Sequence, residues 1–234
     1  MCDRYTCLLP AETLHQTFRT INPLLNLGPS WNIAPLQFAP VVYRHPERGG
    51  RHLDLFQWGL LRWWQRDKRR SRPTIVRAER LTHRGVFYGA LVRRRALVPA
   101  QAFYKWNGKQ LYAITRRDAQ PMAFAGLWQE CRLPDWRISR TFAIVTTVGN
   151  TEMAELRDRV PVILEPSDWP VWLGEAQGDP RSLLHPALEG TWLASPVGDP
   201  RNTGPELLER TDVARDGTWF DWRGAISDFD RDLF

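Results

Sequence analysis

Short runs rich in β-branched and aromatic residues recur along this chain and restrict the folds that it can adopt. They occupy residues 38–44, 53–61, 96–106, 110–115, 123–128, 141–148 and 160–164, and their composition is typical of strands. Asn107-Gly108 separates two of these runs and predicts a tight hairpin. Helices are predicted only at residues 11–21, 86–94, 151–159 and 167–173, with Thr151 and Ser167 as N-caps. Because so few helices cannot alternate with this many strands, the pattern predicts an antiparallel α+β fold and not repeated βαβ units.

The composition excludes several classes of protein. Hydrophobic residues make up 43% of the chain, which is too apolar for a disordered protein. No apolar run approaches the roughly 20 residues that a membrane-spanning helix needs, and no signal peptide is recognisable. Cys2, Cys7 and Cys131 cannot all pair and form no C-x-x-C motif, which excludes a disulfide scaffold and a zinc finger. We therefore expect a cytoplasmic protein without a membrane anchor, a metal ion or a cofactor.

The domain organisation follows from the absence of any repeat or low-complexity linker in residues 1–200. We predict one domain at residues 1–210 and an acidic extension at residues 211–234. The extension contains Trp219, Phe220 and Trp222, and a disordered tail is rarely so aromatic. It is expected either to pack on the domain or to lie across a basic surface of it.

Positive charge is concentrated in residues 62–95, which hold twelve Arg and Lys residues against Asp67 and Glu79. This segment carries a net charge of +10, although the whole chain carries only +6. A solubilising face is one interpretation. A phosphate-binding surface is the other, and the excess of Arg over Lys favours it because the guanidinium contacts anions in a bidentate way. Trp63 and Trp64 lie inside the segment, and aromatic rings among cations are typical of single-stranded nucleic-acid sites.

Cys2 follows Met1 directly, so removal of Met1 leaves a free amine and a thiol on the same residue. A 1,2-aminothiol condenses with an aldehyde, first to an imine and then to a thiazolidine ring. The amine has an ordinary pKa of about 8, so a large fraction is neutral and nucleophilic at physiological pH. A cysteine at position two is a weak signal by itself.

Ordered sequence blocks run from Cys2 to about Leu208 and make that signal stronger. They are Met1-Cys2-x-Arg4-Tyr5, Trp31-Asn32-Ile33-Ala34-Pro35, Trp58-Gly59-Leu60-Leu61, Arg77-Ala78-Glu79, Leu97-Val98-Pro99-Ala100, Phe124-Ala125-Gly126-Leu127-Trp128, Asp158-Arg159-x-Pro161 and Arg201-Asn202-x-Gly204-Pro205. In these blocks the chain resembles the SRAP family (SOS-response-associated peptidase), the abasic-site-processing proteins. The resemblance implies a compact α+β domain with an antiparallel β-barrel-like core and peripheral helices. It also implies a monomer that binds single-stranded DNA, associates with the nucleoid when bound, and traps the aldehyde of an abasic site on Cys2 as a thiazolidine.

Three of the four positions that carry this chemistry in the family differ here. Ile75 stands in place of the family's Asn, Lys105 in place of its Glu and Arg157 in place of its His, so that only Cys2 is kept. Arg cannot shuttle protons near neutral pH, and Ile cannot hydrogen-bond, so acid–base contributions of about 10²–10⁴-fold each are lost. Two added cations should lower the pKa of the Cys2 thiol. Lys105 could itself form a Schiff base, or it could simply pair with Asp3 or a DNA phosphate.

The remaining site residues are carried over from matching blocks. Those expected to contact DNA are Arg4, Asn32, Pro35, Trp63, Trp64, Arg77, Thr146 and Arg159. Those expected to support the site are Glu79, Asp158 and Pro161. The basic residues from Arg66 to Arg72 are expected to form a rim that follows the DNA backbone.

Three functions remain open from the sequence. The first is an abasic-site-processing enzyme that forms a crosslink through Cys2, and the second is a pseudoenzyme that only binds single-stranded DNA. The third, a cysteine peptidase acting on other proteins, has little support because Lys105 and Arg157 cannot activate a thiol as bases. Removal of its own Met1 is the only proteolysis that we expect.

Overall fold

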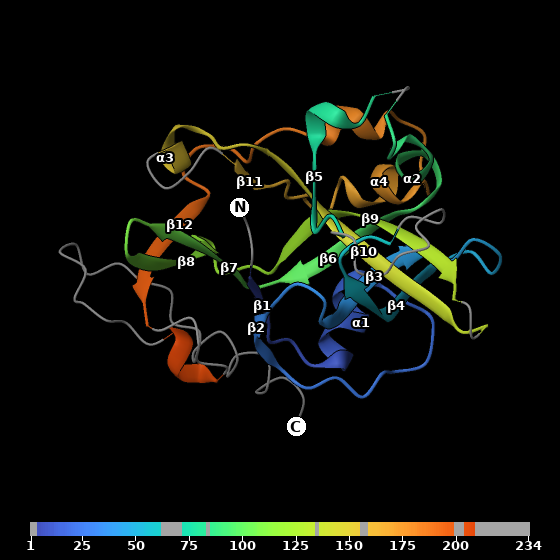
Figure 1. Cartoon of the computed structure of the whole chain (residues 1–234), viewed down its shortest axis with the longest axis horizontal. Coiled ribbons are helices and arrows are strands. Elements are labelled where there is room, and N and C mark those ends of the chain that lie inside the picture. The colour runs from blue at the N-terminus through green and yellow to red at the C-terminus, as the bar shows by residue number, and fades with distance from the viewer. Residues whose placement is uncertain are drawn as a thin grey trace.

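A five-stranded closed barrel forms the centre of the protein, shown in Figure 1 as a computed structural model that describes residues 4–61, 72–82, 85–133, 136–154, 159–198 and 204–208. The barrel strands are β3 (Phe38–Arg44), β4 (Arg51–Trp58), β6 (Arg95–Ala100), β9 (Met122–Arg132) and β10 (Ile138–Val148). The ring closes because β10 pairs with β4 on one side and with β9 on the other. The α+β fold with a barrel-like core is confirmed. One pair in the ring, β4 with β10, is parallel, and the long intervening chain makes that connection possible.

Two short strands extend the barrel at β10. β5 (Ile75–Arg77) pairs with β10 in parallel, and β11 (Arg159–Pro161) pairs with it antiparallel. Both strands are only three residues long, which explains why periodicity alone did not predict β5. They place residues from three distant parts of the sequence beside one another at the end of β10.

A second sheet lies beside the barrel, to its left in Figure 1. Its strand order is β12 (Trp192–Val197), β8 (Gln110–Arg116), β7 (Ala102–Asn107), β1 (Tyr5–Cys7) and β2 (Ser30–Ile33). The hairpin predicted at Asn107-Gly108 is confirmed, because Asn107 pairs with Gln110 and Gly108 has a φ of 56°. That left-handed conformation suits a residue without a Cβ.

The run expected as one strand over residues 96–106 is divided at Gln101. Its first part, β6, belongs to the barrel, and its second part, β7, belongs to the second sheet. The Gln101 N–H donates to the Thr6 carbonyl at 3.0 Å, and the Gln101 side-chain oxygen accepts from the Leu8 N–H at 2.6 Å. These bonds attach the turn to the N-terminal strand, so the chain changes sheet at this residue.

Short helices cover the outside of the strands. They are α1 (Ala11–Phe18), α2 (Tyr88–Arg93), α3 (Thr151–Ala154) and α4 (Trp169–Leu173), with 3₁₀ turns η1 (Ala78–Arg80), η2 (Pro180–Leu183) and η3 (Pro205–Leu208). The N-cap of α4 is Asp168, so the prediction of Ser167 was wrong. The helix expected to reach residue 159 does not do so, because Arg159 pairs with Val148 in β11. No helix among the described residues is long and apolar enough to cross a membrane.

Tryptophans supply much of the core. Trp58, Trp172 and Trp192 are among the largest fully buried side chains. Tyr5 meets Trp58 edge-on with 5.2 Å between ring centroids, which connects the N-terminal strand to the barrel interior. This packing fixes where the chain enters the fold.

Candidate functional site

β5, β10 and β11 bring together several of the residues expected to form the site. In the strand register, Thr146 is the neighbour of Arg77 on one side and of Pro161 on the other. Ile75 pairs with Ile144 on the same parallel edge. Residues from separate parts of the sequence therefore share one surface at the end of β10.

Arg159 is the centre of this cluster. Its Nη2 donates to the Thr146 carbonyl at 2.7 Å, and its Nε donates to the Thr146 hydroxyl at 3.3 Å. Its Nη2 also lies 2.8 Å from the Glu79 carboxylate, the sole ion pair that the described part of the chain shows for either residue. Thr146 is only 1% exposed. It therefore holds Arg159 through these hydrogen bonds and is not itself accessible to a ligand.

Glu79 is the acidic partner in this cluster. Its partial burial favours the protonated form, but the hydrogen bonds and charge of Arg159, with the nearby charge of Arg77, outweigh this and lower the pKa of the carboxyl. A carboxylate that stays ionised fixes the guanidinium in one orientation. Glu79 therefore holds the Arg159 guanidinium in place within this cluster.

Lys105, which we expect to occupy the position of the family's Glu, is buried where β7 of the second sheet meets β11. Its side chain is 1% exposed, and its Nζ donates to the main-chain carbonyl of Arg159. A buried ammonium needs such acceptors because its loss of hydration is costly. The hydrogen bond connects β7 of the second sheet to β11 of the barrel, directly beside the arginine cluster.

Arg4 enters the same region from the N-terminal strand. The Tyr104 N–H donates to the Arg4 carbonyl at 3.0 Å, so Arg4 lies beside the residue that precedes Lys105. The Arg4 guanidinium donates to the Asn32 side-chain oxygen at 2.9 Å, and Asn32 is 6% exposed. Two residues expected to contact DNA are thus held against each other at the start of β1.

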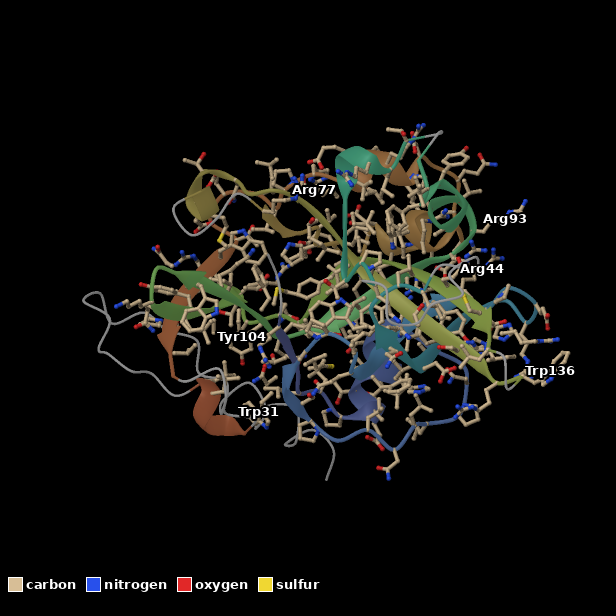
Figure 2. All side chains as sticks on the ribbon, viewed as in Figure 1. Trp31, Arg44, Arg77, Arg93, Tyr104 and Trp136 are labelled. Atoms are coloured by element: carbon tan, nitrogen blue, oxygen red, sulfur yellow. The ribbon has the colours of Figure 1, made fainter. Side chains whose placement is uncertain are left out.

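A pair that the sequence did not single out completes this side of the site. The Tyr104 hydroxyl donates to the Trp31 carbonyl at 2.9 Å, and Figure 2 shows the two labelled side chains near each other. Trp31 stands in one of the blocks quoted above and Tyr104 directly precedes Lys105, and these positions were the available signal. Pro35 lies on an exposed turn that follows β2.

A cavity of about 410 Å³ opens next to Glu79. It is lined by Thr147 from β10 and by Arg181 and Leu184 from the region of η2. Arg181 was not among the residues expected to contribute, because no motif connects η2 with β10 in the sequence. The cavity has room for a group larger than a single side chain beside the arginine cluster.

Several of the expected site residues lie outside the described residues. They are Cys2, Trp63, Trp64, Arg157 and Asp158, together with most of the Arg66–Arg72 segment. Arg72 itself donates to the Gln57 side chain at 2.7 Å.

The two described cysteines are unsuitable as nucleophiles. Cys7 and Cys131 are both free and buried, and burial raises the pKa of the Cys7 thiol to about 12. Burial also raises the pKa of Cys131. The described residues contain no group of His, Cys, Asp or Glu side chains arranged to hold a metal ion.

The closed barrel, the second sheet and the arginine-rich site near β1 together define a class of protein. Comparison with known proteins identifies that class. Residues 1–200 match the model of the family described as SOS response associated peptidase (SRAP), and the chain belongs to this family. The abasic site processing protein YoqW of Bacillus subtilis (strain 168) is 32% identical over 225 residues, covering 89% of this chain and 99% of that protein. The abasic site processing protein YoaM of the same organism is 30% identical over 200 residues, covering 80% and 86%.

Solved structures show the same fold. A protein from Bacteroides thetaiotaomicron superposes with a TM-score of 0.78 at 18% identity, covering 90% of this chain and all of that chain. A phage-related protein from Bordetella bronchiseptica has a TM-score of 0.67 at 25% identity, covering 85% and 95%. The barrel and the second sheet are therefore arranged as in known proteins.

Proposed function

We propose that this protein binds single-stranded DNA as a monomer and processes abasic sites, forming a thiazolidine crosslink through Cys2 once Met1 has been removed. The observation that carries the proposal is the position of Arg4 beside Tyr104 and Lys105, next to the Arg159 cluster. Cys2 stands only two residues before Arg4 in the sequence. The two relatives named as abasic site processing proteins cover 89% and 80% of this chain, which supports the same activity here. A cytoplasmic location, with association to the nucleoid, follows from this role.

The chemistry needs only the aminothiol and the ring-opened sugar. The neutral amine of Cys2 attacks the aldehyde carbon, and the resulting carbinolamine loses one water molecule to give an imine. The Cys2 sulfur then attacks the imine carbon as its proton passes to the nitrogen, which closes the five-membered ring. No oxidant or reductant takes part.

The side chains near the site are better suited to hold the phosphates of a DNA strand than to transfer protons. Arg77 is exposed on β5, and Arg159 is oriented by Glu79 and Thr146, so both can hold phosphate oxygens. Lys105 donates to the Arg159 carbonyl and Ile75 has no polar group, so neither replaces the acid–base residues of the family. The crosslink should therefore form, but slowly.

A second candidate function rests on the same two residues. Lys105 is buried with its Nζ hydrogen-bonded, where the family has a carboxylate. That arrangement favours a protein that binds single-stranded DNA and no longer reacts with it. The two functions predict the same noncovalent affinity and differ only in the covalent product.

Denaturing gel electrophoresis separates the two. The Met1-processed protein is mixed with a single strand that holds one abasic site, and with an undamaged strand of the same sequence. We expect a heat-stable shifted band with the abasic strand alone, lost in Cys2→Ala and kept in Cys131→Ala. Salt-sensitive binding on a native gel without any shifted band would establish the binding-only function, and no binding to either strand would contradict both. Size-exclusion chromatography tests the monomer.

A further inference from the structure

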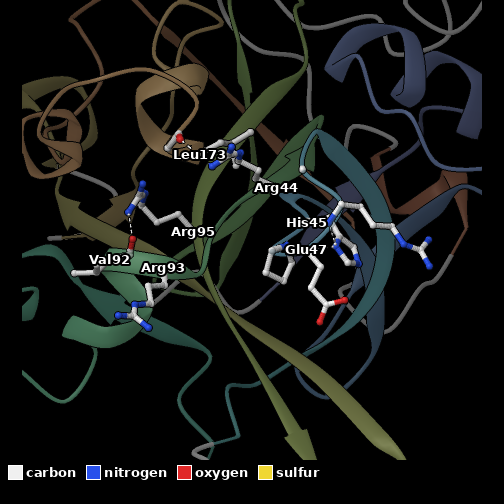
Figure 3. Close-up of a pocket in the computed structure, with 11 residues that line it drawn as sticks. Arg44, His45, Glu47, Val92, Arg93, Arg95 and Leu173 are labelled. Atoms are coloured by element: carbon white, nitrogen blue, oxygen red, sulfur yellow. Dashed lines mark hydrogen bonds between the residues drawn. The ribbon is translucent and has the colours of Figure 1, made fainter.

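A second cavity lies where β3 turns into β4, whereas the candidate site described above lies at the C-terminal end of β10. It has a volume of about 600 Å³ and is formed by three segments: the β3–β4 turn at residues 44–49, the α2–β6 junction at residues 92–95, and the end of α4 at residues 173–174. Figure 3 shows these segments surrounding the opening. Figure 2 places the labelled Arg44 and Arg93 well away from Arg77 and Tyr104. The cavity is therefore separate from the candidate site described above.

The lining of this cavity is strongly cationic. Four arginines contribute to it, Arg44, Arg48, Arg93 and Arg95, against the single carboxylate of Glu47. Among the described residues, none of the four forms an ion pair. Other arginines of the same barrel do so: Arg51 lies 2.7 Å from Glu175, and Arg140 lies 2.9 Å from Asp54. Within the described part of the chain, the single carboxylate of Glu47 leaves most of the positive charge of the cavity unmatched.

Arg95 is held rigidly at the back of the cavity. Its Nε donates to the Trp172 carbonyl, and its Nη1 donates to the Leu91 carbonyl and, at 2.8 Å, to the Val92 carbonyl. These acceptors are among the last carbonyls of α2 and α4, and burial lowers the pKa of the guanidinium. The charged form is thus partly desolvated, and an anion in the cavity would stabilise it.

Gly174 shapes the approach between the arginines. It has a φ of 74°, and a Cβ at this position would lie 2.8 Å from Arg95 Nη2. Its carbonyl accepts from Arg44 Nη1 at 3.2 Å. The absence of a side chain lets both guanidiniums converge on the end of α4, so the site is organised before any ligand arrives.

We propose that this arginine pocket binds the phosphate groups of a DNA strand, as a second contact beyond the candidate site. Guanidinium forks match phosphate oxygens in a bidentate way, and several from different segments can hold a phosphodiester and its neighbour. The apolar walls from Val92 and Leu173 suit the sugar that joins them. The inference rests on the proposed function, because it takes DNA as the partner of this protein.

The test compares short and long undamaged single strands. Arg44→Gln with Arg93→Gln removes two exposed charges from the pocket, and Arg19→Gln with Arg132→Gln removes two exposed charges elsewhere. We expect the pocket double variant to bind the long strand about tenfold more weakly at low salt, with a shallower salt slope by about 0.7 for each lost phosphate contact. Its affinity for a strand of about six nucleotides, near the site size of a single binding domain, should match wild type. The control double variant should lose much less on the long strand.

The outcomes separate this inference from the proposed function. If both double variants bind the long strand equally while wild type binds it well, the pocket does not contact DNA and the proposed function still stands. If wild type binds neither strand, both fail. Inorganic phosphate followed by ³¹P NMR tests a free ligand: broadening that needs Arg44 and Arg93, without any effect of these residues on DNA, would overturn the DNA contact. Thermal unfolding checks that each variant folds, and Arg48→Gln replaces the double variant if it does not.

Discussion

At the scale of single residues, the position of Lys105, which we expect to replace the family's Glu, bears on its chemistry. A lysine that forms a Schiff base must bring a neutral amine to an aldehyde carbon. Here Nζ is buried and donates to the Arg159 carbonyl, so it is held away from that role. Pairing with an exposed DNA phosphate is disfavoured by the same burial.

This geometry predicts that no lysine adduct forms. In Cys2→Ala protein mixed with an abasic single strand, any product that borohydride traps on a denaturing gel should come from the α-amine of residue 2, and adding Lys105→Arg should leave its yield unchanged. A trapped band that disappears when Lys105→Arg is added would show that the lysine reacts and that the observed hydrogen bond is broken during the reaction. A band that survives Lys105→Arg would come from another amine and would leave the prediction for Lys105 intact.

The Glu79–Arg159 pair predicts a pH dependence of stability. The pKa of Glu79 is lowered from its ordinary value of 4.5, so its contribution is fully present above that value and is lost as the pH falls through the folded pKa. Because the carboxylate is 53% exposed, Glu79→Gln should cost only about 0.5 kcal/mol at neutral pH, in the range of surface pairs. Urea unfolding at neutral pH and well below pH 4.5 should show that difference disappearing in acid. Glu12→Gln, on an exposed part of α1, controls for the loss of one negative charge, and an equal cost at both pH values would contradict the prediction.

At the scale of elements, the sequence predicted strands well where each has its own pattern and poorly where pairing alone defines it. The 38–44 run matches β3, and Asn107-Gly108 marked the β7–β8 turn, because hydrophobic content and turn chemistry are local signals. β1 and β5 have three residues each and are strands only through their partners. The matching blocks gave candidate residues for the site, but no local pattern gave the contacts between them. The bond from Lys105 to Arg159 depends on how two sheets meet, which no local pattern records.

Gln101 shows how one residue directs two elements. It stands at the point where the chain leaves β6 for β7, and its side-chain oxygen accepts from the Leu8 N–H at 2.6 Å. Gln101→Ala should leave that N–H without a partner at a residue that is 6% exposed, at a cost of about 1–3 kcal/mol. Gln101→Glu keeps an acceptor oxygen and should cost less. Denaturant unfolding measures both, and an equal loss in the two variants would mean that the hydrogen bond contributes little to the junction.

At the scale of the whole molecule, salt should affect the binding of the strand and the ring-closing reaction differently. The chain carries a net charge of +6, and its described surface has two arginine-rich regions, one around Arg159 and one around Arg95. Under the proposed function, electrostatic attraction to phosphates controls how much strand is bound, and salt weakens it because the release of counterions becomes less favourable. Ring closure between Cys2 and an aldehyde involves no change in net charge near the backbone, so salt should leave that step almost unchanged.

The rate of crosslinking to an abasic strand should therefore fall steeply with salt when protein is scarce and hardly at all when protein is saturating. A time course on denaturing gels at two protein concentrations and several salt concentrations measures both limits. Arg77→Gln, which removes an exposed cation from β5, should lower the rate at scarce protein and leave the saturated rate near wild type. A saturated rate that falls with salt as steeply as the other would mean that the cations act in the chemical step. The altered residues at positions 75, 105 and 157 would then have to be understood as a different catalytic solution and not as a loss.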